Sequence, residues 1–412
     1  MLLFLAEIKS NFINLKLRER LYLFLIFIDS FLLIVFGKEY SKLQVIYHLH
    51  LHDIFYILIF ILSLFFSYKI RFRLIELLII ISIIYLIISL FFQINNENAL
   101  YFTIRQFMIY GYIALTYFII RPIFSFNKGF SLALQLVFLI GSTAFLAQII
   151  FLTINIINGD YQPFFGRHAL SPSSVEVGTI IVCAFSLAYL SGFKRHIVFL
   201  FVLFLSTSAG KDSAYLSIIV TYLCFYLLAS PLLNKLIIFF LFLVGLLLII
   251  IFVPTFTDVN MTWRLIFWKE TLLSLWQTND IYFGRGFGIH YLDENTRNVL
   301  NNLMKSRGEN VIIDNEEMYY ITSHNSFITI LQHLGLFNIL LILPIFRYLK
   351  IYINLTKSNI EIITLLLCLI GFSVWAFFNL ILELPHSASL YWVIFFVFTF
   401  SLKFKKNISS NP

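Results

Sequence analysis

The chain has 412 residues, of which 60% are hydrophobic and only 12% are charged, and its mean hydropathy is +0.91. A soluble domain cannot hide so much apolar surface, so the composition excludes that class. The formal net charge of +8 does not indicate a nucleic-acid partner, because the basic residues sit in short segments between long apolar runs, where they act as membrane-topology signals.

Long apolar runs recur along the whole chain and predict an all-α, polytopic integral membrane protein with about 12 transmembrane helices. The predicted spans are residues 21–36, 48–67, 74–92, 106–120, 130–157, 174–192, 197–208, 212–230, 236–253, 324–346, 360–380 and 388–402. No small-residue cleavage pattern follows the first span, so we expect that span to stay as an anchor.

Lys and Arg are distributed unevenly between the spans. Most of them lie in alternate segments, such as the first twenty residues, "YKIRFR" (68–73) and "KFKK" (403–406). The positive-inside rule then places both termini in the cytoplasm. We divide the chain into transmembrane helices in 1–253, one large outer loop in 254–323, and the last helices with a cytoplasmic tail in 324–412.

The loop 254–323 is long enough to carry structure of its own. Apolar residues recur in its first part at spacings of three and four, which predicts an amphipathic helix on the membrane surface. The expected apolar stripe comprises Met261, Leu265, Trp268, Leu272, Leu275 and Trp276. Arg264 borders this stripe, where it can either snorkel to lipid phosphate or grip a ligand phosphate with its bidentate fork.

Other polar residues of the outer segments are candidate ligands. "GRGFG" (284–288) puts Arg285 among glycines, which permit positive φ or close approach of the backbone to an anion. Lys211 in "STSAGKD" either belongs to a simple turn or supplies a charge. Arg167 lies in "FFGRHAL" (164–170). Glu176 stands just inside a span, where a carboxylate is costly unless it is paired or hydrated.

Metal and thiol chemistry have weaker signals. "HLHLHD" (48–53) would put His48 and His52 on one helical face, but the pattern is not specific for a metal. The cysteines have neither metal-binding nor redox spacing, so we expect them to be packed in the membrane interior: Cys183, Cys224 and Cys368.

"SHNSFITILQHLG" (323–335) begins a long apolar run with a polar pair. We expect Ser323 to cap the helix and His324 to lie in its first turn, where the helix dipole favours a neutral imidazole. A neutral imidazole can act as a general base. The alternative is an ordinary interfacial side chain. His333 lies deeper in the same span, where packing is the expected role.

"MTWRLIFWKETLLSL" (261–275), "FGRGFG" (283–288) and "SHNSFITILQHLGLFNILLILP" (323–344), with the loop-before-span topology, resemble the O-antigen polymerase (Wzy-type) and O-antigen ligase superfamily. The resemblance implies a GT-C-type glycosyltransferase of the bacterial inner membrane that needs no metal or cofactor. Its donor would be a glycan linked to undecaprenyl pyrophosphate, and a chain-length regulator and a flippase would be its protein partners.

The same resemblance implies roles for individual residues. His324 would deprotonate the acceptor hydroxyl, and Arg264 and Arg285 would hold the pyrophosphate. Further substrate-binding positions would be Lys211, Arg167, Glu176 and Asn325. "STSAGKD" departs from a Ser-x-Ser-Arg-like motif of many relatives, and a lysine does not reproduce the arginine fork.

Several functions stay open. We favour a polymerase that passes the growing glycan onto a lipid-linked repeat unit, because the Phe- and Ile-rich composition is typical of variable polysaccharide loci. The alternatives are a ligase that transfers glycan to lipid A-core, a non-catalytic assembly partner, and a lipid-linked glycan flippase or transporter. A transporter would use ionisable residues within the membrane, for which Asp29 and Glu76 are candidates, but no internal repeat is evident.

Overall fold

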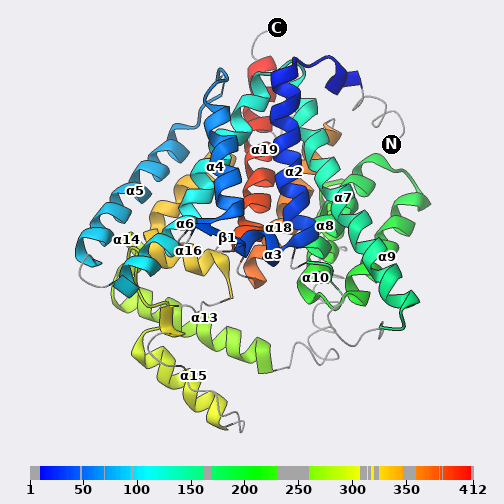
Figure 1. Ribbon diagram of the computed structural model, residues 1–412. Helices are drawn as coiled ribbons and strands as arrows, with labels where there is room; N and C mark the ends of the chain where they lie inside the picture. The colour runs from blue at the N-terminus through cyan, green and yellow to red at the C-terminus, as the bar shows by residue number, and fades with distance from the viewer. Residues whose placement is uncertain are drawn as a thin grey trace.

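The computed structural model describes residues 10–46, 49–68, 70–93, 97–160, 169–171, 173–229, 259–306, 313, 317–319, 324–346, 359–379, 381–382 and 384–409. Almost all of these residues are helical, as the sequence predicts (Figure 1). The helices are α2 (Leu17–Phe36), α3 (Lys38–Lys42), α4 (Leu51–Ser63), α5 (Arg73–Gln93), α6 (Glu97–Ile120), α7 (Gly129–Ile157), α8 (Ser174–Tyr189), α9 (Phe193–Ser208), α10 (Asp212–Ala229), α13 (Val259–Gln277), α14 (Asp280–Phe283), α15 (Glu294–Ser306), α16 (Ser326–Leu334), α18 (Ile360–Phe378) and α19 (Pro385–Ser409).

Short elements join these helices. Three 3-10 turns are η1 (Arg121–Ser125), η2 (Glu317–Tyr319) and η3 (Gly335–Asn338), and the strands β1 (Gln44–Ile46) and β2 (Leu49–His50) pair antiparallel. Because β2 ends at His50 and α4 begins only at Leu51, the expected helix through 48–52 is wrong. His48 itself lies outside the described residues.

Six helices among the described residues are long and apolar enough to cross a membrane. They are Arg73–Gln93, Leu100–Ser125, Gly129–Ile157, Ser326–Phe346, Ile360–Phe378 and Ser387–Lys405, and shorter apolar helices cover Leu51–Ser63, Ser174–Tyr189 and Asp212–Leu228. The chain is therefore a helical membrane protein. Helices occupy all the remaining predicted spans apart from 236–253, which lies outside the described residues.

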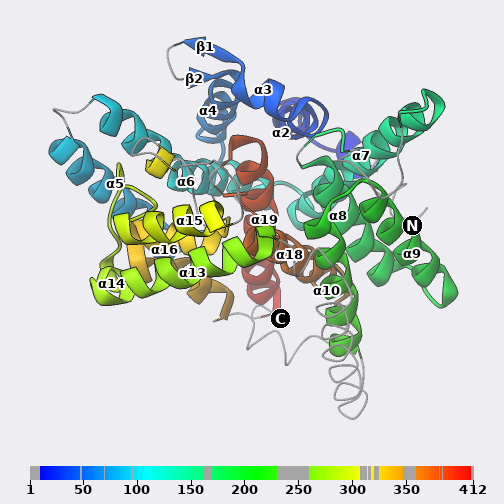
Figure 2. The same cartoon turned by 90° about the horizontal axis from the view of Figure 1, so that it is seen from below.

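Helix α19 is the centre of the bundle. Of its apolar window, 89% of the residues are buried inside the protein, against 28% for the window of α5. Seen from below, α5, α6 and α13–α16 gather on one side of α18 and α19, and α7–α10 on the other (Figure 2). The exposed apolar side chains of α5 therefore form part of the lipid-facing surface of the protein.

The predicted loop 254–323 has a small hydrophobic core of its own. Phe267 of α13 packs with Leu292, Leu300, Ile313 and Met318. Helix α13 is confirmed, but the expected stripe is only half right. Trp268 and Leu275 are buried, whereas the other described members of the stripe are exposed: Leu265, Leu272 and Trp276. Helix α13 is apolar on two faces, so one face packs on protein while the other is left for lipid.

Candidate functional site at the start of helix α16

Asn325 caps α16 and fixes the start of the helix. Its side-chain oxygen accepts hydrogen bonds from the backbone N–H groups of Phe327 (3.0 Å) and Ile328 (3.2 Å). The residue is 1% exposed. The helix start is also tied to the chain beyond α18, because the Ser326 hydroxyl donates to the carbonyl of Asn379 at 2.9 Å. Asn325, not Ser323, is the cap of α16. The role that these contacts give to Asn325 is therefore structural.

His324 precedes this cap. Its φ is 51°, in the left-handed region that non-glycine residues rarely adopt. The expected position in the first turn of the helix is therefore wrong, since the cap stands one residue later. The left-handed turn places the imidazole beside the indole of Trp263 on α13, with ring centroids 5.7 Å apart and an interplanar angle of 73°.

Arg264 lies next to this imidazole. One guanidinium nitrogen, Nη1, donates to the carbonyl of Phe378 at 3.1 Å, which links α13 to the end of α18. Burial, and secondarily the positive charge of Arg264, lowers the pKa of His324 from 6.5 to about 4. The imidazole is thus neutral at physiological pH, as expected, but for a different reason than the helix dipole.

Sequence reasoning missed Trp263 as part of this site. Its indole Nε1–H is buried and has no hydrogen-bond acceptor within the described parts of the chain. Buried indole N–H groups usually find an acceptor. The sequence does offer one signal for Trp263, because it stands directly before the candidate residue Arg264. A helix presents neighbouring residues about 100° apart, so both side chains can face one site.

The "GRGFG" turn packs on the other end of α16. Its glycines have φ of 75° (Gly284), 82° (Gly286) and 73° (Gly288), which confirms the expected positive φ. The backbone N–H of Gly286 donates to the carbonyl of His333 at 3.0 Å, and His333 Nδ1 lies 2.9 Å from the carbonyl oxygen of Gly286. His333 is fully buried, in agreement with the packing role expected for it.

The side chain of Arg285 is engaged within this turn. Its Nε donates to Asp280 Oδ2 at 2.8 Å and its Nη2 donates to Ser274 Oγ at 2.6 Å. Ser274 lies ten residues after Arg264, or about 15 Å along α13. The structure therefore places Arg285 with Asp280 and Ser274, at the far end of the helix from Arg264.

A second polar cluster surrounds Glu176, with Ser213 in contact and Lys211 nearby. Glu176 is 2% exposed, and its Oε1 accepts a hydrogen bond from Ser213 Oγ at 3.1 Å. Lys211 lies near enough for its positive charge to act on this carboxyl group, although the described residues form no ion pair between the two. Oε2 of Glu176 is buried and has no hydrogen-bond partner among the residues that the structure describes. The carboxyl group is thus hydrogen-bonded through one oxygen, and the other oxygen can still accept a hydrogen bond.

The structure therefore brings together two groups of the predicted site residues. His324, Asn325 and Arg264 form one group, and Glu176 and Lys211 form the other, while Arg167 lies outside the described residues. A scan against known protein families found no match to this chain, and a comparison with curated proteins found none either.

Proposed function

We propose that this protein is an integral-membrane glycosyltransferase with a GT-C-like architecture, and that His324 is its general base. One observation carries the proposal: a partly buried, neutral imidazole lies beside an arginine and a tryptophan where the loop joins the span 326–346. A neutral imidazole at this depth can take a proton from a hydroxyl. A neighbouring guanidinium suits an anionic leaving group.

The donor in this proposal is a glycan on undecaprenyl pyrophosphate. Arg264 would bind the pyrophosphate, and the unpartnered N–H of Trp263 offers one of its oxygens a further hydrogen bond. An anion bound at Arg264 would offset the charge that lowers the pKa of His324. The pKa would then rise by the smaller contribution of that charge, while burial, the larger cause, still lowers it, so the base would be stronger with the donor in place than without it.

The proposed reaction is a glycosyl transfer from the pyrophosphate to an acceptor hydroxyl. The acceptor hydroxyl oxygen forms a bond to the anomeric carbon of the donor sugar, while the bond from that carbon to the pyrophosphate breaks. The hydroxyl proton goes to His324, and undecaprenyl pyrophosphate leaves with its negative charge beside Arg264. The free carboxylate oxygen of Glu176 is suited to accept a hydrogen bond from a sugar hydroxyl, so we assign Glu176 and Lys211 to the acceptor glycan.

We assign Arg285 a positioning role in place of a direct contact with the donor. Its two side-chain hydrogen bonds hold the turn 284–288 against α13 and α14. That turn supports the end of α16 through the backbone of Gln332 and His333. Helix α16 in turn carries His324 at its other end.

The proposed topology has about 12 spans, with both termini in the cytoplasm and the site on the periplasmic face of the inner membrane. Contacts among described residues support it. Segments expected on the inner side contact one another, since Lys128 donates to Asn11 at 2.9 Å and Lys405 pairs with Glu361 at 2.9 Å.

The favoured reaction is polymerisation onto a lipid-linked repeat unit, and the alternative is ligation to lipid A-core. Deletion of the gene followed by a glycan gel separates the two. A lost polymerase leaves lipid A-core capped with a single repeat unit. A lost ligase leaves unligated polymer on the lipid carrier. Wild-type polysaccharide in the deletion strain would contradict both.

One observation favours the transporter alternative. His52 Nδ1 lies 3.0 Å from Asp29 Oδ1, both side chains are buried within the helices, and Tyr40 donates to the same carboxylate at 2.9 Å. Ionisable groups within a membrane often serve transport. Loss of a flippase would strand repeat units on the inner leaflet and leave lipid A-core bare, a third pattern on the same gel.

A further inference from the structure

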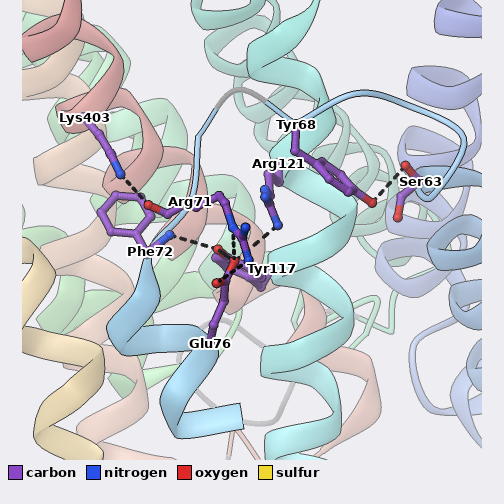
Figure 3. Close-up of polar contacts among 8 residues, drawn as sticks. All are labelled: Ser63, Tyr68, Arg71, Phe72, Glu76, Tyr117, Arg121 and Lys403. Atoms are coloured by element: carbon purple, nitrogen blue, oxygen red, sulfur yellow. Dashed lines mark hydrogen bonds and ion pairs between the residues drawn. The ribbon is translucent and has the colours of Figure 1, made fainter. Parts of the chain in front are cut away.

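A polar cluster surrounds Glu76 at the end of the bundle that lies away from His324 (Figure 3). Two guanidinium nitrogens of Arg71 donate hydrogen bonds to this carboxylate, Nε at 3.3 Å and Nη2 at 3.1 Å. The Tyr117 hydroxyl donates to Oε1 at 2.9 Å, and Arg121 Nη1 donates to the same oxygen at 3.4 Å. One carboxylate thus serves two arginines and a tyrosine.

Arg121 is the buried member of this cluster. It is 4% exposed, and its guanidinium carbon lies 4.1 Å from the ring centroid of Tyr68 and 5.6 Å from that of Tyr117. Its Nε is buried and has no hydrogen-bond partner in the described portion of the chain. A guanidinium has five N–H donors. The hydrogen bond to Glu76 is long, and with Nε unpartnered among the described residues this cation is poorly satisfied.

Positive charge exceeds negative charge in the cluster. The Lys403 ammonium donates to the carbonyl oxygen of Arg71 and lies 4.9 Å from the ring centroid of Phe72. Arg71 and Arg121 therefore share one carboxylate, Glu76, and Lys403 lies beside them, whereas the nearby Lys405 is paired with Glu361. Partly buried positive charge without enough counter-charge is costly, and an anion would relieve that cost.

The cluster lies where lipid headgroups would lie. The adjacent spans begin at Arg73 and end at Ser125 and Lys405. Helix α5, which starts there, exposes a row of apolar side chains: Leu77, Ile80, Ile84 and Ile87. Arg71, with 68% of its side chain exposed, stands directly before this lipid-facing helix. A headgroup phosphate beside α5 is thus at the right depth to reach the cluster.

We propose that Arg71, Arg121 and Lys403 form a binding site for the phosphate of a net-negative lipid headgroup, with Glu76 holding the two arginines in place. The exposed guanidinium and the ammonium contact the phosphate, and Arg121 adds its buried charge. The proposal is independent of the glycosyltransferase activity, because the site lies at the other end of the bundle from His324.

The test uses the full-length protein in a neutral detergent, with thermal unfolding followed by tryptophan fluorescence. Dioctanoyl phosphatidylglycerol, dioctanoyl phosphatidylcholine and inorganic phosphate are titrated separately. We expect phosphatidylglycerol to raise the unfolding midpoint far more than the other two. Arg71→Gln and Lys403→Gln should each weaken its apparent affinity about ten-fold, the effect of losing one charge-assisted hydrogen bond.

Arg73→Gln is the matched control, since Arg73 is exposed at the same end and its loss changes the net charge equally. It should change the affinity less than two-fold. An equal loss in Arg73→Gln would overturn the site in favour of diffuse attraction. No midpoint shift with any anion would overturn it outright. A shift with inorganic phosphate as large as that with the lipid would overturn the assignment to a lipid headgroup.

Discussion

His324 and Trp263 come from segments more than fifty residues apart, yet their rings meet nearly at right angles with centroids 5.7 Å apart. This contact joins the start of the span 326–346 to helix α13. It also buries the imidazole beside Arg264. The functional proposal therefore depends on α13 and the start of α16 keeping this relative position.

Acidification should destabilise the protein partly through His324. Its pKa is about 4 in the folded state and 6.5 ordinarily. Because the folded-state pKa is lower, the unfolded chain binds more protons between these values. The contribution of the neutral imidazole is thus fully present above pH 6.5 and is lost as the pH falls toward 4. We expect roughly 1–3 kcal/mol from this group.

The measurement is the unfolding midpoint of the wild type and of His324→Gln between pH 4 and pH 7. The curve of the variant should be flatter over this range. His290→Gln is a control for a second histidine whose pKa is lowered by burial. Parallel curves for the wild type and His324→Gln would show that His324 is not buried neutral.

Arg264→Lys should impair use of the lipid-linked donor. A lysine keeps the charge but loses the planar fork that matches phosphate oxygens. We expect kcat/KM for the donor to fall roughly ten- to hundred-fold, the effect of one strong charged hydrogen bond. Lys269→Gln, at an exposed position on the same helix, should leave the rate unchanged. Equal rates for Arg264→Lys and the wild type would argue against the donor role.

Arg285 and Asp280 should behave as one structural unit. Arg285→Gln and Asp280→Asn each remove the 2.8 Å ion pair. The double variant should be less destabilised than the sum of the two, with a coupling of about 1 kcal/mol. Both single variants should lose similar activity. If Arg285→Gln alone strongly raised the donor KM, Arg285 would contact the pyrophosphate directly.

Gly284→Ala should be far more harmful than Gly159→Ala. Both glycines have positive φ, 75° and 76°, so both substitutions carry the same backbone strain. A Cβ at Gly284 would lie 2.3 Å from the carbonyl oxygen of His333, whereas one at Gly159 meets nothing within 4 Å. We expect about 1–2 kcal/mol of destabilisation at Gly159 and at least about 3 kcal/mol at Gly284. Similar unfolding midpoints would mean that the turn does not pack tightly on α16.

The positions of the helices followed from the apolar runs, because a membrane helix must satisfy its own backbone and so needs a continuous apolar stretch. Hydropathy could not say which face of α13 packs on protein, since lipid and protein core are equally apolar. Leu265 and Trp276 were therefore expected to share a face with Trp268 and Leu275, which the structure buries instead.

The site was predictable only in part. Glycine chemistry indicated the positive φ of the "GRGFG" turn. Its partners, Ser89 and Gln106, are long-range contacts that no local pattern reveals. The left-handed backbone of His324 was not predictable either, since tertiary contacts must hold a non-glycine residue in that region. The role of Arg285 changed for the same reason, because Asp280 and Ser274 occupy its fork.

The most direct test of the central claim is transfer by purified protein supplied with lipid-linked repeat units from the deletion strain. We predict that His324→Ala lowers turnover roughly 10²- to 10⁴-fold, the usual effect of losing a general base. It should still insert in the membrane and elute as a folded protein. His290→Ala, which replaces a more exposed histidine of the same loop, should retain wild-type turnover. Turnover of His324→Ala within a few-fold of the wild type would contradict the account.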